Sequence, residues 1–263
     1  MQTDAGIVVE TTAEGIVTIR LDRPDRLNAL GVGMVDALER AIAGAIAMPA
    51  RVLLVRGTGR AFCAGADLKE RRTMEEAARV KHNRAINAAV NALAAAPMPT
   101  MAVINGLALG GGCEMALACD LRYAAEDAQI GLTEMRIGAI PGAGGTQRMP
   151  RVIGAARALE MMLMGEPVNG TRAEQIGLVH AAVPAAELDT YVQRIAEVLA
   201  SRSPSGAHTI KRLVREGMER PLEAGLELER AALQQVLASA DYAEGLAAFA
   251  EKRQPRFSGG NAT

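Results

Sequence analysis

The chain has 263 residues, of which 49% are hydrophobic, and its formal net charge at pH 7 is −1. This length and apolar content suffice to bury a large core, and the balanced charge excludes a bulk attraction to polyanions. Aromatic residues make up 2% of the chain and tryptophan is absent, so the core must be aliphatic, with methionine as filler. No apolar run approaches the roughly 18 residues of a membrane-spanning helix, and the polar start, with Asp4 and Glu10, argues against a signal peptide.

Three apolar runs, at residues 16–21, 52–55 and 101–104, predict buried β-strands. Between the first two runs, apolar side chains recur at helical spacing, at Val35, Leu38, Ile42 and Ile46. Strands that alternate with helices in this way indicate an α/β layered core.

The most informative stretch follows the third strand and reads Gly110-Gly111-Gly112-Cys113-Glu114. An apolar helix over residues 113–119 is expected to open from these glycines. Because glycine has no side chain, the N–H groups of such a loop are open to a ligand, and the helix dipole favours negative charge on an oxygen there. The alternative is structural: the glycines let the helix pack against a strand, and Glu114 complements the dipole.

A second carboxylate favours the chemical interpretation. Glu134 lies in the otherwise apolar segment 130–135, where an isolated carboxylate costs free energy unless it has a role or a partner. With Glu114 it can form an acid/base pair at an oxyanion site. A second glycine cluster, residues 141–145, is expected to be another place where bare backbone meets a ligand.

The chain beyond residue 187 lacks strand-like runs and is predicted to be helical. The expected helices cover residues 191–201, 206–218, 222–238 and 242–252, with breaks at Ser203-Pro204 and Arg220-Pro221. Before them, Thr171 and Glu174 fit a capping box that opens a short helix ending at Gly177. We therefore expect an α/β core over residues 1–200 and a helical subdomain over residues 201–263.

Several motifs together are similar to a known family. The segments 61–70 (AFCAGADLKE), 104–120 and 134–148 resemble the enoyl-CoA hydratase, or crotonase, family in order and spacing, and the likeness extends from residue 16 to residue 253. Within the family, segments 62–72, 107–122 and 249–257 look most like the methylglutaconyl-CoA hydratase branch. The resemblance implies a ββα superhelical core, although no ββα repeat is visible in the sequence, and a C-terminal helical subdomain that packs on a neighbouring subunit in trimers or hexamers.

The resemblance also implies the roles of four residues. The N–H groups of Ala66 and Gly111 are expected to form an oxyanion hole for a thioester carbonyl, and Glu114 and Glu134 to hold and activate water. The implied reaction adds water to a 2-enoyl-CoA thioester through an enolate, with coenzyme A as part of the substrate, no separate cofactor and no metal. Enoyl-CoA isomerisation, or another reaction that forms an enolate, is the alternative. Which glutamate is the acid and which the base stays open.

Further contacts to the CoA-bearing substrate are implied at family positions: Arg26, Ala64, Ala66, Asp67, Leu68, Lys69, Gly111, Phe249 and Lys252. Phe249 and Lys252 would often come from the adjacent subunit. If the branch-level likeness holds, the site also contains a cation for a distal carboxylate on the acyl chain, but the sequence does not identify that cation. Cytoplasmic location and a role in fatty-acid, lipid or branched-chain amino-acid metabolism are expected.

Other reactive residues have no motif around them. Cys63, Cys113 and Cys119 have neither zinc-ligand nor disulfide spacing, which fits a reducing compartment, and we expect none of them to be a nucleophile. The three histidines, His82, His180 and His208, are expected to be surface or structural residues. A basic stretch could in principle bind RNA; it contains Lys69, Arg71, Arg72, Arg79, Lys81 and Arg84. Interleaved glutamates and the lack of stacking aromatics favour a solvated helix face instead.

Overall fold

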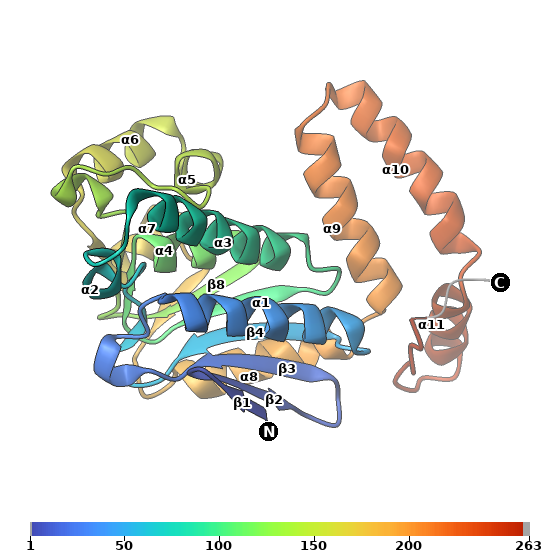
Figure 1. The fold of residues 1–263 in the computed structure, drawn as a ribbon. Coiled ribbons are helices and arrows are strands. Elements are labelled where there is room, and N and C mark those ends of the chain that lie inside the picture. Colours follow the sequence, from blue (N-terminus) through green and yellow to red (C-terminus); the bar gives the residue numbers. More distant parts are fainter. Residues whose placement is uncertain (1, 260–263) are drawn as a thin grey trace.

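The structure is a computed structural model, and it describes residues 2–259 (Figure 1). Two sheets form the body of the fold, a seven-stranded sheet in the order β1-β2-β3-β4-β6-β8-β11 and a four-stranded sheet in the order β10-β9-β7-β5. The strands of the large sheet are β1 (Gln2–Asp4), β2 (Ile7–Thr11), β3 (Ile16–Leu21), β4 (Val52–Gly57), β6 (Thr100–Ile104), β8 (Leu121–Ala125) and β11 (Ala181–Val183). Those of the small sheet are β5 (Ala61–Cys63), β7 (Leu107–Leu109), β9 (Gln129–Gly131) and β10 (Val168–Asn169).

Helices follow the strands along the chain. The first group is η1 (Pro24–Arg26), α1 (Val32–Ala47), α2 (Leu68–Arg71), α3 (Glu76–Ala95), α4 (Gly111–Ala118), η2 (Glu134–Ile137), α5 (Gly145–Ile153), α6 (Ala155–Met164) and α7 (Gly170–Gln175). The second is α8 (Leu188–Ala200), α9 (Pro204–Met218), α10 (Leu222–Leu237) and α11 (Ala240–Ala250). Helix α1 packs on β2 and β3, while α8 packs on β3, β4 and β8, so helices sandwich the large sheet (Figure 1).

Successive strands alternate between the two sheets, which creates the expected ββα repeat. The pairs β4-β5, β6-β7 and β8-β9 each place one strand in the large sheet and the next in the small sheet, and helical segments follow each pair. Within each sheet the neighbouring strands of this series are parallel. The carboxyl ends of β5 and β7 therefore lie at the same edge of the small sheet.

The core is aliphatic, as the composition predicts. Ile16, Leu53, Met101 and Leu93 are almost fully buried, and so is one aromatic side chain, Phe62. The three predicted strands are confirmed as β3, β4 and β6, and the helix predicted between the first two is α1. Within residues 2–259, no helix combines the length and apolar character needed to cross a membrane.

The start of α7 differs from the sequence prediction. Its N-cap is Asn169, whose side chain accepts a hydrogen bond from the N–H of Arg172. Thr171 lies inside the helix, so the predicted Thr171–Glu174 capping box is wrong. Asparagine caps a helix at least as well as threonine does. Asn169 is also the last residue of β10, and the pairing of β10 with β9 sets where the extended backbone ends and the helix can begin. The predicted stop at Gly177 agrees with its positive φ of 78°.

Helices α9, α10 and α11 form an arm that stands beside the rest of the molecule (Figure 1). Lys211 of α9 anchors it: its ammonium donates to the carbonyl of Ala96 at 2.8 Å and lies 2.5 Å from the carboxylate of Asp120. The arm covers little of its own apolar surface, because α9 has no buried residue and Met218 and Leu222 are 77% and 78% exposed.

Candidate active site

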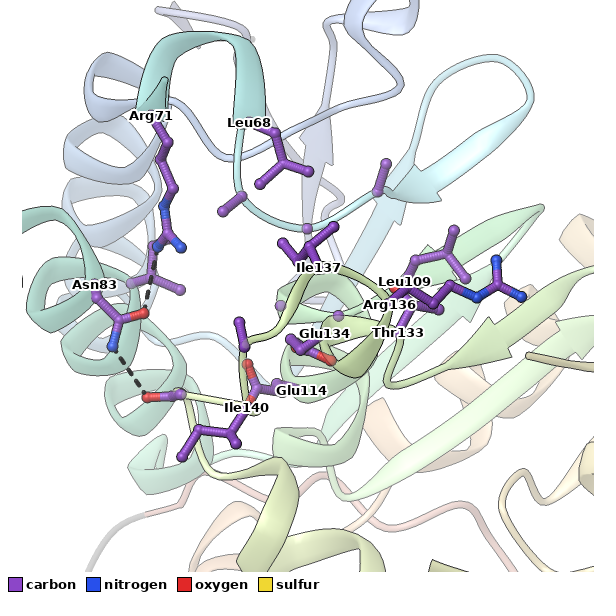
Figure 2. A pocket seen from close by; sticks show the side chains of 18 residues that line it. Leu68, Arg71, Asn83, Leu109, Glu114, Thr133, Glu134, Arg136, Ile137 and Ile140 are labelled. Carbon is purple, nitrogen blue, oxygen red and sulfur yellow. Dashed lines mark hydrogen bonds between the residues drawn. The ribbon is translucent and has the colours of Figure 1, made fainter. Parts of the chain in front are cut away.

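A cavity of about 220 Å³ opens at the edge where β5 and β7 end (Figure 2). Backbone from two glycine-containing turns and carboxylates from two further segments meet in its wall. The lining residues are Ala64, Gly65, Ala66, Leu68, Arg71, Asn83, Ile86, Leu109, Gly110, Gly111, Glu114, Thr133, Glu134, Arg136, Ile137, Ala139, Ile140 and Gly142. The structure therefore brings together four residues that the sequence predicts to act at one site, Ala66, Gly111, Glu114 and Glu134.

The backbone turns after β5 and β7 lie in van der Waals contact. A Cβ atom on Gly65 would lie 2.8 Å from the carbonyl oxygen of Leu109 and 3.2 Å from the nitrogen of Gly111, so only glycine allows this approach. The φ of Gly65, 87°, is also one that other residues rarely adopt. Neither the N–H of Ala66 nor that of Gly111 donates to an acceptor within the described part of the chain. Two free N–H donors in adjacent turns are the arrangement that an oxyanion requires.

Helix α4 begins at Gly111, with Gly110 as its N-cap. The first N–H groups of a helix have no intrahelical acceptor, and the helix dipole adds partial positive charge there. A Cβ on Gly112 would lie 2.0 Å from the carbonyl oxygen of Cys63, so this glycine lets α4 pack directly on β5. Gly112 thus serves packing, as the structural interpretation expects, and Gly111 has an N–H without an acceptor in the described chain, which fits the chemical interpretation.

Glu114 is buried in the first turn of α4, with 3% of its surface exposed. Its Oε1 accepts hydrogen bonds from the N–H of Ala143 at 2.7 Å and from the N–H of Gly145 at 2.8 Å. The prediction that residues 141–145 offer free backbone to a ligand is therefore wrong for these two N–H groups, because they bind a carboxylate of the chain itself. Burial raises the pKa of Glu114, while these two N–H donors and the charge of Arg148 oppose that rise.

Glu134 has a different environment in the same cavity. It begins η2, and its Oε2 is buried without a hydrogen-bond partner among residues 2–259. Burial raises the pKa of Glu134 to about 7, and the negative charge of Glu114 adds to the rise. Figure 2 shows both carboxylates in the same region of the cavity. The two backbone donors favour the ionised form of Glu114, whereas burial without a donor at Oε2 favours the protonated form of Glu134.

The predicted substrate-binding residues fall into three groups, of which two lie in or near the cavity. Ala64, Ala66, Leu68 and Gly111 line the cavity. Arg26, Asp67 and Lys69 instead gather at the start of α2, outside the lining. There the buried carboxylate of Asp67 accepts from the N–H groups of Lys69 and Glu70 and lies 3.8 Å from the Arg26 guanidinium.

Phe249 and Lys252 lie far from the cavity of their own chain. Phe249 lies in the last turn of α11, where 87% of its surface is exposed, and Lys252 follows the helix. Figure 1 shows α11 at the opposite side of the molecule from α2. A contact of these residues with substrate thus requires a second copy of the chain, and their role stays a prediction.

Sequence reasoning missed four polar residues of the cavity, Arg71, Asn83, Thr133 and Arg136. Arg71 had been grouped with a basic surface stretch, but its guanidinium turns toward Asn83 in the wall (Figure 2). The stretch itself divides between α2 and α3. Arg71 and Arg72 are neighbours of the same residue type, so the sequence does not tell which of them faces the cavity. The rotation of α2 about its own axis decides this.

The cysteines and histidines lie outside the chemistry of this site. All three thiols are free and buried. Burial raises the pKa of Cys63 and of Cys119 to about 12, and it also raises the pKa of Cys113. Such thiols are poor nucleophiles. His82 is buried and accepts a hydrogen bond from Arg71, and His180 accepts one from the N–H of Arg122, so both are structural.

Comparison with known proteins agrees with this geometry. The family model described as enoyl-CoA hydratase/isomerase matches residues 11–260. An enoyl-CoA isomerase/hydratase of Mycosarcoma maydis is 40% identical over 255 residues, covering 93% of each chain. The mitochondrial methylglutaconyl-CoA hydratase of Rattus norvegicus is 38% identical over 257 residues, covering 95% of this chain and 82% of the rat protein. The crystal structure of an enoyl-CoA hydratase from Bacillus anthracis superposes with a TM-score of 0.94 at 39% identity, covering 97% of this chain and all of that one. With this agreement between site, sequence and fold, the chain belongs to the enoyl-CoA hydratase/isomerase family, whose enzymes act on acyl-CoA thioesters.

Proposed function

We propose that this enzyme is a hydratase that adds water across the double bond of a 2-enoyl-CoA thioester. The observation that carries the proposal is the meeting of two free N–H donors and two carboxylates of unequal proton affinity in one cavity. Conjugate addition needs both elements, because negative charge develops on the thioester oxygen while one proton leaves water and another reaches carbon.

In the proposed reaction, the thioester oxygen accepts hydrogen bonds from the N–H groups of Ala66 and Gly111. Ionised Glu114 takes a proton from water as the water oxygen bonds to the β-carbon. The electron pair of the double bond moves toward the thioester and forms an enolate, whose oxygen the two N–H groups stabilise. Protonated Glu134 then gives its proton to the α-carbon. The enzyme ends with the proton on Glu114 and regains its starting state by proton exchange.

Substrate assays test the proposal. Purified protein is mixed with crotonyl-CoA, and loss of the conjugated thioester absorbance is followed together with chromatography of the product. The expected product is the 3-hydroxyacyl-CoA. An enzyme that instead interconverts 2-enoyl-CoA and 3-enoyl-CoA without adding water would be an isomerase, the activity that also stands in the name of the Mycosarcoma maydis relative.

The remaining assignments are also part of the proposal. Water and the 2-enoyl-CoA thioester together contain all the atoms of the product, and the reaction involves no oxidation or reduction. We therefore propose no separate cofactor and no metal. Lys69 and Arg26 are proposed to meet the phosphates of CoA, because both are cations near the cavity mouth residue Leu68. We place the protein in a reducing compartment, the cytoplasm, on the basis of its three free thiols; the rat relative is named as mitochondrial.

The assembly is proposed to be a trimer or a hexamer. The arm formed by α9, α10 and α11 exposes apolar side chains along all three of its helices, among them Val214, Leu233 and Phe249. An isolated chain would leave this surface in water, and closure of a symmetric ring would bury it. Such packing would also bring Phe249 and Lys252 to the site of a neighbouring copy. Residues 1–200 would then form the catalytic core and the arm the oligomerisation subdomain.

A further inference from the structure

Arg71 is a cation in the cavity wall without an ionic partner. Its Nε donates to Nδ1 of His82 at 3.4 Å, and one of its terminal nitrogens donates to Oδ1 of Asn83 at 3.3 Å. Both acceptors are uncharged groups, and no carboxylate within residues 2–259 lies at ion-pair distance from the guanidinium. The other lining cation, Arg136, is paired with Glu166. Arg71 therefore keeps N–H groups and a full positive charge for a ligand.

The side chain of Arg71 is held in one orientation. His82 lies on α3 and is 3% exposed. Its burial lowers the pKa of the imidazole, and the positive charge of Arg71 lowers it further. A lowered pKa favours the neutral imidazole, which can accept the hydrogen bond. Asn83, the next residue of α3, also donates to the carbonyl of Gly142 at 3.5 Å. Gly142 precedes the two residues whose N–H groups hold Glu114. The guanidinium is thus fixed relative to the catalytic carboxylates.

The surroundings make an unpaired cation unfavourable unless a ligand supplies an anion. Apolar side chains form much of the cavity wall, among them Ile86 and, in Figure 2, Leu68, Ile137 and Ile140. Partial burial costs the guanidinium part of its hydration, and a carboxylate that accepts two parallel N–H groups would restore it. Arg71 and Glu114 line the same cavity, and the charge of Glu114 acts on the guanidinium.

We propose, on the basis of the hydratase function proposed above, that Arg71 binds a carboxylate at the distal end of the acyl chain. The preferred substrates are then CoA monothioesters of unsaturated dicarboxylic acids. The phosphates of CoA are unsuitable occupants, because the long pantetheine arm separates them from the thioester. A carboxylate on the acyl chain can meet Arg71 in the same cavity that holds the two free N–H groups, and the cation would offset its repulsion by the two glutamates.

The test compares two substrates of equal chain length, pent-2-enoyl-CoA and its dicarboxylic counterpart pent-2-enedioyl-CoA. The proteins are the wild type, Arg71→Met, Arg71→Lys and the matched control Arg72→Met, which removes an exposed arginine outside the cavity lining. The wild type is expected to prefer the dicarboxylic substrate at least about 10-fold in kcat/KM, the scale of one charge-assisted hydrogen bond. Arg71→Met should lower kcat/KM for that substrate about 10- to 100-fold and leave the neutral substrate nearly unchanged.

The two remaining variants sharpen the comparison. Arg71→Lys should keep part of the preference, because the charge remains while the planar fork is lost. Arg72→Met should behave as the wild type does. Equal losses on both substrates in Arg71→Met, or a wild type without preference for the carboxylate, would overturn the role of Arg71. Both results leave the proposed hydration intact.

A binding measurement separates this proposal from the hydratase function. Pentanoyl-CoA and glutaryl-CoA have the same chain length, differ in the distal carboxylate and cannot be hydrated. Calorimetric titration is expected to give a Kd at least about 10-fold lower for glutaryl-CoA with the wild type and equal values for the two ligands with Arg71→Met. If the wild type binds glutaryl-CoA and pentanoyl-CoA with equal affinity, carboxylate binding at Arg71 is refuted, whatever the catalytic assays give. If the wild type hydrates no enoyl-CoA but still binds glutaryl-CoA more tightly, only the hydratase function is refuted.

Discussion

At the scale of single residues, Glu114 and Glu134 are the same residue type in one cavity, and their hydrogen-bond partners separate their roles. Two backbone N–H groups stabilise the ionised form of Glu114, whereas the buried Oε2 of Glu134 has no such donor within the described chain. Two backbone donors on Oε1 of Glu114, against an Oε2 of Glu134 without a donor, favour the proposed roles of base and acid for two identical side chains.

Replacement of either glutamate by glutamine keeps its shape and removes its proton chemistry. We expect Glu114→Gln and Glu134→Gln each to lower kcat for hydration by about 10²–10⁴-fold, the size of a general acid or base contribution. Binding of a saturated acyl-CoA should largely survive. Steady-state kinetics and calorimetry check this, and a folded variant with near-normal kcat would remove that glutamate from the mechanism.

The pH dependence of hydration follows from the same pair. In the proposed mechanism Glu134 acts as an acid and must be protonated, and its pKa is raised to about 7. The value of kcat/KM should therefore fall as the pH rises through about 7, and on the acid side it should fall as Glu114 becomes protonated. A profile of kcat/KM between about pH 5 and 9 reports the two macroscopic pKa values of the pair. A rate that increases between pH 7 and 9 would instead identify Glu134 as the base.

At the scale of elements, the proposed oxyanion hole depends on where α4 begins. Gly111 is the first helical residue, a position that proline often occupies and at which a missing N–H breaks no helix bond. Gly65 then holds the neighbouring turn against this helix end. The site is thus built from the end of one strand and the start of one helix.

Gly111→Pro should delete one oxyanion donor and leave α4 intact. We expect hydration to fall at least about 10²-fold, as for loss of one such donor in a hydrolase. Gly111→Ala is the matched control, because it adds a Cβ at the same place, in ordinary contact with Leu30, and keeps the N–H. The ratio of the hydration rates of the Ala and Pro variants then measures the contribution of the Gly111 N–H donor. A Pro variant as active as the Ala variant, with equal melting temperatures, would exclude Gly111 from the hole.

At the scale of the whole molecule, the arm needs a partner surface. Asp241, at the start of α11, accepts hydrogen bonds from Ser203 and Ser205, which fastens the end of the arm to its beginning. The apolar residues of the arm, by contrast, point largely to solvent in the single chain. Helices α9 and α11 of the arm are thus held to each other by hydrogen bonds within the chain, but the apolar surface of the arm is left without a packing partner.

Removal of residues from Asp241 onward should therefore weaken both oligomerisation and CoA binding, although Glu114 and Glu134 remain. Phe249→Ala is the gentler variant, because this side chain is 87% exposed and supports little of its own fold. Light scattering and calorimetric titration of CoA measure the two effects. A stable, fully active monomer would contradict the proposed assembly and return the CoA contacts to a single chain.

The amino-acid sequence by itself determined the features that depend on neighbouring residues. Apolar periodicity located β3, β4, β6 and the C-terminal helices to within a few residues, because burial patterns repeat with the period of the element. The glycine run identified the start of α4, and an isolated glutamate in an apolar segment identified the second carboxylate. The family resemblance then supplied Ala66, which no local pattern singles out.

Only the tertiary structure decided how distant segments meet. The pairing of β5 with β7 brings Ala66 beside Gly111, and the fold of residues 141–145 turns two N–H groups toward Glu114 rather than toward a ligand. The direction of Arg71 depends on the phase of α2 and on His82 and Asn83 of α3. Contacts of this kind depend on the order of strands in a sheet and on the packing of helices, which involve residues far apart in the chain and leave no mark on the local sequence around any one of them.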